Sequence, residues 1–230
     1  ENPRQAYDMQ DVIKAVADAN SVFTIQPMFG QSLITCLARL GGRPVAIVAN
    51  QPQYIAGSIT VEAADKATQF IQVADSFHLP LIFLTDNPGV LAGSSSEKAG
   101  ILRYAGRMFL AQHHATVPKI QLTVRKAYGF GSTAMGMNPF SGQTLNLAFP
   151  AVSLRAMPAR GADEATGADQ ETREALREAE LSSGYRSASA LSIDDIIDPS
   201  DTRNMLLRGL EIASSRIDGA VNPKQRTVNL

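Results

Sequence analysis

The sequence predicts a single-domain α/β fold, and three observations support that prediction. Runs typical of buried strands alternate along the chain with runs of helical apolar spacing, which is the pattern of α/β proteins. A chain of 230 residues, 44% of them hydrophobic, can bury a sizeable core without disulfides. No segment has the composition of a flexible linker, so we expect one domain over residues 1–230.

Spacing of apolar residues and turn signals define the elements in the first half. Val12, Ile13 and Val16 share one helical stripe, and Gly41-Gly42-Arg43-Pro44 separates two apolar runs as a hairpin turn would. The elements expected here are a helix over 8–19, strands over 33–40 and 45–49, a helix over 61–77 and a strand over 80–85.

The second half continues the alternation. Serines 94–96 are candidate N-caps for a helix that carries Ile101, Leu102, Ala105, Met108 and Phe109. Strands are expected over 118–124 and 151–157, and a charged exposed helix and loop over 160–180. Pro199-Ser200-Asp201 begins a last helix, and the tail from Asn222 is expected to be an extended arm. The inward residues of that helix are expected to be Met205, Leu206, Leu210, Ala213 and Ile217.

Composition excludes several classes of function. Lys plus Arg number 21 against 22 Asp plus Glu, so neither nucleic acid nor an anionic membrane is an expected partner. The apolar runs fall short of the roughly 20 residues that span a bilayer. Glu1-Asn2-Pro3-Arg4 leads into a polar segment, so no signal peptide is expected and a cytoplasmic location follows. The chain starts with Glu rather than Met, and we expect it to be a fragment of a longer protein.

Conventional catalytic and metal-binding sets are hard to assemble. The single cysteine, Cys36, allows no intrachain disulfide or cysteine zinc site, and its apolar neighbours indicate a buried thiol. His78 and the adjacent His113 and His114 lack a zinc-ligand spacing, so we expect no metal. Serines 94–96 lack the Gly-x-Ser-x-Gly pattern of a nucleophile elbow.

Two glycine-bearing loops, each after an expected strand, remain as candidates. The first is Asp86-Asn87-Pro88-Gly89, and the second runs from Ala127 to Gly136. If a helix begins at Gly131 or Ser132, its first N–H groups lack intrahelical acceptors and could hold a developing oxyanion. One such donor contributes roughly 3 kcal/mol to transition-state stabilisation in other enzymes. Alternatively, the glycines only permit tight strand-to-helix turns, and the residues alone favour that simpler interpretation.

Several short motifs occur in the order found in one family. They include Asn50-Gln51-Pro52, Asp86-Asn87-Pro88-Gly89 and Arg125-Lys126-Ala127-Tyr128-Gly129. The complete set covers residues 7–13, 42–52, 56–57, 64–67, 86–89, 115–118, 125–129, 145–150 and 197–203. In this order the chain resembles the carboxyltransferase β subunit of biotin-dependent acyl-CoA carboxylases, of the propionyl-CoA and acetyl-CoA carboxylase type.

The resemblance implies a crotonase-like α/β fold of repeated ββα units. It further implies that the chain matches the C-terminal carboxyltransferase domain and lacks the N-terminal one. In that family the N-terminal half carries most of the acyl-CoA site, and the C-terminal half mainly receives carboxybiotin. The active site lies where the C-terminal half of one protomer faces the N-terminal half of another. The implied cofactor is biotin, carried covalently on a partner protein. The implied partners are a biotin carboxylase and biotin carrier α subunit, an acyl-CoA, and further copies in a homo-oligomer. The isolated domain is expected to be inactive.

Residue by residue, the resemblance assigns the biotin oxyanion hole to the main-chain amides of Phe130 and Gly131. Gly129, Gly89 and Pro88 would bind the cofactor, with Gly89 on the facing loop. Thr133 stands where the family selects the acyl chain and usually has Asp or Ile. Its small side chain would leave room for a longer or different acyl group.

Two departures from the family leave other functions open. Phe130 replaces a common glycine, and a non-glycine residue adopts a positive φ only at a cost. Residues 158–164 also differ from the family's small-residue run. These changes favour a non-catalytic carboxylase-like scaffold as an alternative. A crotonase-type hydratase or hydrolase is another, with Glu62 and Glu97 as candidate acids.

Overall fold

The computed structural model describes residues 5–137, 142–155 and 169–214. One mixed sheet runs through the molecule in the order β1-β2-β3-β4-β5-β6-β8, and β7 pairs with β5 off this path. The strands are β1 (Phe23–Ile25), β2 (Leu33–Leu40), β3 (Arg43–Asn50), β4 (Leu81–Asn87), β5 (Lys119–Tyr128), β6 (Leu145–Ala148), β7 (Ser153–Arg155) and β8 (Asp195–Ile196). Strands β1 to β3 are antiparallel, and the later pairs are parallel.

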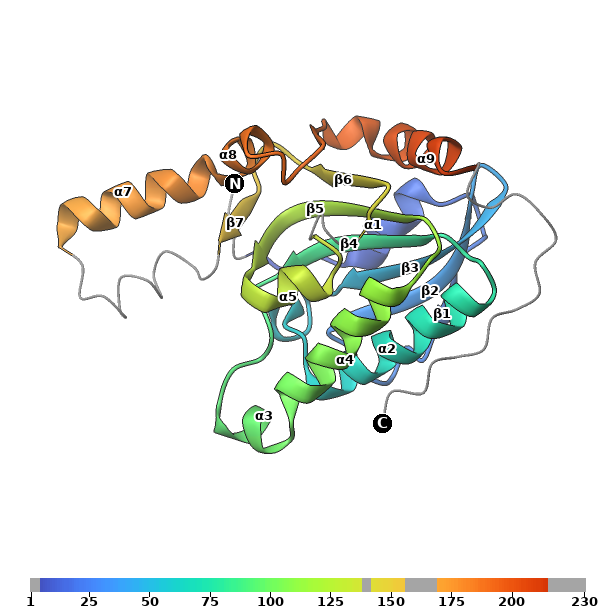
Figure 1. Ribbon diagram of the computed structural model, residues 1–230, viewed down its shortest axis with the longest axis horizontal. Helices are drawn as coiled ribbons and strands as arrows, with labels where there is room; N and C mark the ends of the chain where they lie inside the picture. The colour runs from blue at the N-terminus through green and yellow to red at the C-terminus, as the bar shows by residue number, and fades with distance from the viewer. Residues whose placement is uncertain (1–4, 138–141, 156–168, 215–230) are drawn as a thin grey trace.

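Helices cover both faces of this sheet, so the molecule has three layers (Figure 1). On one face lie α1 (Met9–Val16) and α9 (Thr202–Ile212), and on the other lie α2 (Val61–Ser76) and α4 (Ile101–His114). The other helices in the described part of the chain are α3 (Ser94–Lys98), α5 (Gly129–Ala134), α7 (Gln170–Leu181) and α8 (Ser183–Ser189), and residues 55–57 and 199–201 form 3₁₀ turns. The predicted α/β class is confirmed.

The central strands are buried on both faces because each packs against a helical layer. All seven residues of β4 are buried. Ile82 and Leu84 face the α1 and α9 side, whereas Leu81 and Phe83 face α2 and α4. Cys36 is fully buried in the first of these two core clusters, and burial raises the pKa of its thiol to about 12. The expected buried thiol is confirmed.

Most sequence-predicted elements are present, with corrections near the loops. Serines 94–96 do not cap α4, because they lie inside α3. Helix α4 begins after Gly100, which adopts the left-handed conformation with a φ of 85°. In α4, the residues Ile101, Ala105 and Met108 form the buried stripe, whereas Leu102 is 69% exposed. The short strands β1, β6 and β8 were not predicted. Of the strand expected over 151–157, residues 153–155 form β7, and residues 156–157 lie outside the described residues. Ile217 and the tail from Asn222 lie outside the described residues.

The ββα unit implied by the resemblance is clearest at the start of the sheet. Strands β2 and β3 form a hairpin in which Leu40 pairs with Arg43, so Gly41 and Gly42 are its two turn residues. Both have positive φ, as a two-residue turn of this twist requires. Helix α2 then leads to β4, which pairs parallel to β3. No described helix is long and apolar enough to cross a membrane.

Candidate functional site

The carboxyl ends of β3, β4 and β5 meet at one edge of the sheet, because these three strands are parallel neighbours. Strand β3 ends at Asn50, β4 at Asn87 and β5 at Tyr128. The segments that follow are therefore brought together, and both predicted glycine loops are among them. Open α/β sheets bind ligands beyond this edge, which makes it the candidate site.

The two glycine loops touch at Gly131 and Gly89. A Cβ placed on Gly131 would lie 2.7 Å from the Cα of Gly89 and 2.5 Å from Oδ1 of Asn87. Such distances exclude any side chain at Gly131. Gly89 has a φ of 115°, and a Cβ there would lie 3.4 Å from the Tyr128 carbonyl oxygen. The glycines therefore do more than permit turns, since they let two loops approach to backbone contact.

Phe130 occupies the α5 helix without a positive φ of its own. The left-handed conformation falls on Gly129, whose φ is 54°. Phe130 therefore does not carry the backbone strain that a positive φ would impose on a non-glycine residue. Its ring is 39% exposed and lies 5.9 Å from the ring of Phe109 on α4, measured between centroids. The side chain therefore packs toward α4.

The helix α5 begins two residues earlier than Gly131, at Gly129. As the second and third residues of α5, Phe130 and Gly131 have amides with no acceptor one turn earlier within the helix. Such N–H groups at a positive helix end can donate to an anionic oxygen. Thr133 is half-buried one turn on from Phe130, on the same side of α5, and its carbonyl accepts from Nε2 of Gln112 at 3.3 Å. Pro88 is half-buried beside the buried Gly89.

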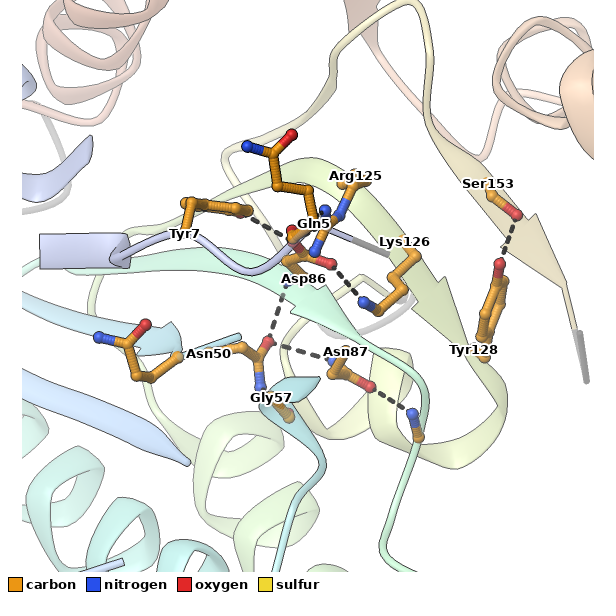
Figure 2. Close-up of polar contacts among 12 residues, drawn as sticks. Gln5, Tyr7, Asn50, Gly57, Asp86, Asn87, Arg125, Lys126, Tyr128 and Ser153 are labelled. Atoms are coloured by element: carbon orange, nitrogen blue, oxygen red, sulfur yellow. Dashed lines mark hydrogen bonds and ion pairs between the residues drawn. The ribbon is translucent and has the colours of Figure 1, made fainter. Parts of the chain in front are cut away.

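Two fully buried asparagines connect the strand ends (Figure 2). Oδ1 of Asn50 accepts from the N–H of Asp86 at 3.2 Å and from Nδ2 of Asn87 at 3.1 Å. Oδ1 of Asn87 accepts from the N–H of Gly89 at 2.9 Å. These bonds satisfy polar groups that would otherwise be costly to bury.

A buried ion cluster lies next to them. The carboxylate of Asp86 is fully buried, 3.0 Å from Nε of Arg125 and 3.4 Å from Nζ of Lys126. The Tyr7 hydroxyl donates to it at 2.8 Å. Burial raises the pKa of that hydroxyl, and the Asp86 charge adds to the rise. Burial also lowers the pKa of Lys126, against the opposing attraction of Asp86.

A break in the β4–β5 register explains why two consecutive cations reach one carboxylate. Thr85 pairs with Thr123, yet Asn87 pairs with Ala127, so β5 has extra residues opposite Asp86. Bulges of this kind re-aim side chains and recur near active sites. Sequence reasoning missed this cluster. A possible signal was charged residues at the ends of two neighbouring strands.

The residues of the hydratase alternative do not converge on the loops. Glu62 lies in the first turn of α2 and Glu97 in α3, and both are exposed. Of the histidines, His113 and His114 have ring centroids 5.6 Å apart at the end of α4. Within ranges 5–137, 142–155 and 169–214, no group of three His, Cys, Asp or Glu side chains could hold a metal ion. Residues 158–164 lie outside these ranges.

Comparisons with known proteins identify relatives along the whole chain. The family model described as the carboxyl transferase domain matches residues 1–228. The chain is 35% identical to the propionyl-CoA carboxylase carboxyltransferase subunit of Haloferax mediterranei, covering 100% of the chain and 46% of that relative. It is 33% identical to the methylmalonyl-CoA decarboxylase subunit alpha of Veillonella parvula, again over 100% and 46%.

A solved structure matches the fold equally well. The transcarboxylase 12S crystal structure with hydrolysed methylmalonyl-coenzyme A bound superposes with a TM-score of 0.88 at 34% identity. The match covers 99% of this chain and 44% of that one. The crotonase-like fold implied by the resemblance is thereby confirmed. The chain spans about half the length of the curated relatives it matches. By its sequence, its fold and the extent of both matches, the chain belongs to the carboxyl transferase domain family.

Proposed function

We propose that this chain is the biotin-receiving half of a carboxyltransferase site. In this proposal residues 1–230 form the C-terminal domain of a longer subunit, and a preceding N-terminal domain supplies most of the acyl-CoA site. The contact between Gly131 and Gly89 carries the proposal, because it joins the two loops that the family resemblance assigns to biotin. The substrate would be acetyl-CoA, propionyl-CoA or an acyl-CoA with a longer chain.

The donor set of the site suits biotin bound to a carrier protein. A carbonyl oxygen needs N–H donors, and two consecutive amides at the start of α5 supply them. The start of α5 lies against the Gly89 loop, because a Cβ on Gly131 would lie only 2.7 Å from the Cα of Gly89. When bound, biotin would bring the carboxyl group to be transferred and its ureido oxygen as the acceptor.

Each site residue then has a defined task. The amides of Phe130 and Gly131 would donate to the ureido oxygen of bound biotin and would stabilise negative charge there, an effect of roughly 3 kcal/mol for one donor in comparable sites. Gly129 supplies the left-handed turn that aims both amides. Gly89 and Pro88 form the facing wall, and Thr133 borders the path of the acyl chain.

The relatives support transfer in either direction. One is named a propionyl-CoA carboxylase subunit and another a methylmalonyl-CoA decarboxylase subunit. A half-site that stabilises charge on biotin would serve both, because the same oxygen becomes charged in the forward and the reverse reaction. A biotin carboxylase and carrier subunit would be the partner for the forward direction.

Carboxyl transfer measured on the complete subunit and on this chain tests the proposal. The assay supplies carboxylated biotin carrier and acetyl-CoA or propionyl-CoA and measures the carboxylated product. We expect turnover by the complete subunit and none by residues 1–230 alone. Efficient transfer by the chain alone would contradict the half-site, and an inactive complete subunit would contradict carboxyl transfer altogether.

The scaffold alternative rests on Phe130. The variant Phe130→Gly of the complete subunit distinguishes it from a catalytic carboxyltransferase. We expect the variant to lower kcat, because glycine frees the backbone at a donor amide and Phe109 loses its ring contact. Loss of that contact costs about 1 kcal/mol of folding stability. A variant that gains activity from an inactive parent would favour the scaffold. Phe109→Ala is the matched control, since it removes the same contact and leaves the amide backbone unchanged.

A further inference from the structure

The buried side chain of Asn50, at the end of β3, contacts both the end of β4 and the 3₁₀ turn at residues 55–57. Its Oδ1 accepts from Asp86 and Asn87 on the β4 side, while its Nδ2 donates to the carbonyl of Gly57 at 3.1 Å (Figure 2). Asn50 is 0% exposed, so no water substitutes for these partners in the folded chain. The side chain therefore fixes the 3₁₀ turn after β3 to the end of β4.

The turn that Asn50 holds is strained. Ile55, Ala56 and Gly57 have φ values of 48°, 53° and 80° in succession. A β-branched residue in the left-handed region is a backbone outlier, and such strain concentrates at functional sites. A Cβ on Gly57 would lie 2.5 Å from the carbonyl oxygen of Asp86, so the turn presses directly on β4.

Asn87 extends the connection to the glycine loops. Its Oδ1 binds the N–H of Gly89 and also borders Gly131, whose Cβ position would be 2.5 Å away. A bond from Asn87 to the residue two positions later is an ordinary turn feature. The bond from its Nδ2 to Asn50 is not part of that turn, and it ties the turn to a neighbouring strand.

We propose that Asn50 and Asn87 are positioning residues that set the distance between the Gly89 loop and the donor amides of Phe130 and Gly131. This inference rests on the proposed biotin site and deepens it. Asn50 accepts a hydrogen bond from Asn87, and Asn87 accepts one from Gly89 and contacts Gly131. These contacts set the positions of the two donor amides, which belong to Phe130 and Gly131. Misplacement of a reacting group by about 1 Å can cost roughly 100-fold in rate, so this chain of contacts affects turnover more than binding.

The test substitutes Asn87→Ser in the complete subunit. A serine hydroxyl can still accept from the Gly89 N–H, as in related turns, but it is too short to reach Asn50. The matched control is Asn146→Ser. Asn146 is also buried, at 2% exposed, and its Nδ2 donates to the carbonyl of Met137, which directly follows the second glycine loop, and to that of Ser192. Neither partner belongs to the Asn50–Asn87–Gly89 contacts. Carboxyl transfer, melting temperature and hydrogen exchange of residues 86–91 and 129–134 are measured for both variants.

We expect Asn87→Ser to lower kcat about 10- to 100-fold with the acyl-CoA KM changed less than about twofold. Hydrogen exchange should accelerate in both loop segments. Asn146→Ser should lower the melting temperature comparably and leave kcat within about threefold. Equal kcat values in the two variants would overturn the positioning role. Unchanged exchange over 129–134 in Asn87→Ser would overturn it even if the parent subunit has no transferase activity, which would refute only the proposed function.

Discussion

At the scale of single residues, the site requires glycine at position 131, where no side chain fits. Gly131 is the point where α5 contacts the loop after β4, and its contacts are backbone and a buried amide rather than flexible side-chain ends. The two neighbours are themselves joined, because Oδ1 of Asn87 accepts from the N–H of Gly89. Its φ is not what demands glycine, since the left-handed residue is Gly129. Space alone demands it.

Gly131→Ala is therefore expected to destabilise the fold by about 1–3 kcal/mol through overpacking. It should also lower carboxyl transfer by the complete subunit at least tenfold, because a donor amide is displaced. Urea unfolding and the transferase assay measure the two effects. Gly106→Ala is the control: it lies in α4 with open space around its Cβ position, and helix propensity predicts a gain of about 1 kcal/mol. A neutral Gly131→Ala would contradict the contact.

At the scale of elements, buried charge determines how β4 and β5 meet. The bulge in β5 directs Arg125 and Lys126 at Asp86, and Arg125 also donates to the carbonyl of Gln5 at 2.7 Å. The N-terminal segment is thereby fixed over the strand ends through Tyr7. Arg125 and Lys126 share the Asp86 carboxylate, so removing the charge of Asp86 would leave two largely buried cations without a counter-charge.

Asp86→Asn should cost roughly 3–5 kcal/mol of folding stability, the usual effect of removing one partner from a buried ion pair. Denaturant unfolding of residues 1–230 measures it. Asp65→Asn provides the comparison, because Asp65 lies 3.9 Å from Arg107 and both side chains are partly exposed. Pairs of that kind contribute about 0–1 kcal/mol. Similar losses in the two variants would show that Asp86 is not the anchor of this strand end.

A second charged contact joins three elements away from the site. The carboxylate of Asp18 accepts from the N–H groups of Gly41 and Gly42 in the β2–β3 turn, at 2.9 and 2.7 Å, and from Arg203 of α9. Arg203 also donates to the carbonyl of Val16 in α1. The hydrogen bond from Arg203, followed by that from Gly42, lowers the pKa of Asp18 to about 2.

This shift predicts a pH dependence with a defined sign. Because the pKa is lower in the folded chain than the usual 3.8, the ionised carboxylate stabilises the fold fully above about pH 4. That contribution is lost as the pH falls from about 4 to about 2. Urea unfolding between pH 2 and 6 should therefore show a shallower acid branch for Asp18→Asn. Asp11→Asn, at an exposed position of α1, should retain the parent slope. Parallel curves for the parent and Asp18→Asn would be inconsistent with the contact.

At the scale of the whole molecule, the sequence predicts the long helices and central strands better than the short strands at the edges of the sheet. Helix α2 and the β2–β3 hairpin are predictable because apolar spacing and a two-glycine turn are local signals. Strands β1 and β8 have three and two residues, too few for any periodicity, and exist through pairing with longer neighbours. The start of α4 was misassigned because its N-cap is Gly100, whereas the serines lie in α3, whose N-cap is Gly93.

The site divides in the same way. Both glycine loops are recognisable from single stretches of sequence, and the structure brings them into contact. The convergence of Asp86, Arg125 and Lys126 depends on a register shift between strands about 40 residues apart, which no local pattern encodes. Asn50 likewise acquires its importance only from partners on another strand.

The central claim is that the amides of Phe130 and Gly131 receive biotin, and an NMR titration of the ¹⁵N-labelled chain tests it most directly. A biotin amide carries the same ring as carrier-bound biotin and needs neither the acyl-CoA half of the site nor turnover. We predict that the largest amide shift changes fall on Phe130 and Gly131, with smaller ones at Gly89. Gly131→Ala should abolish them. Saturable shifts confined to other segments, or none at millimolar ligand, would contradict the claim.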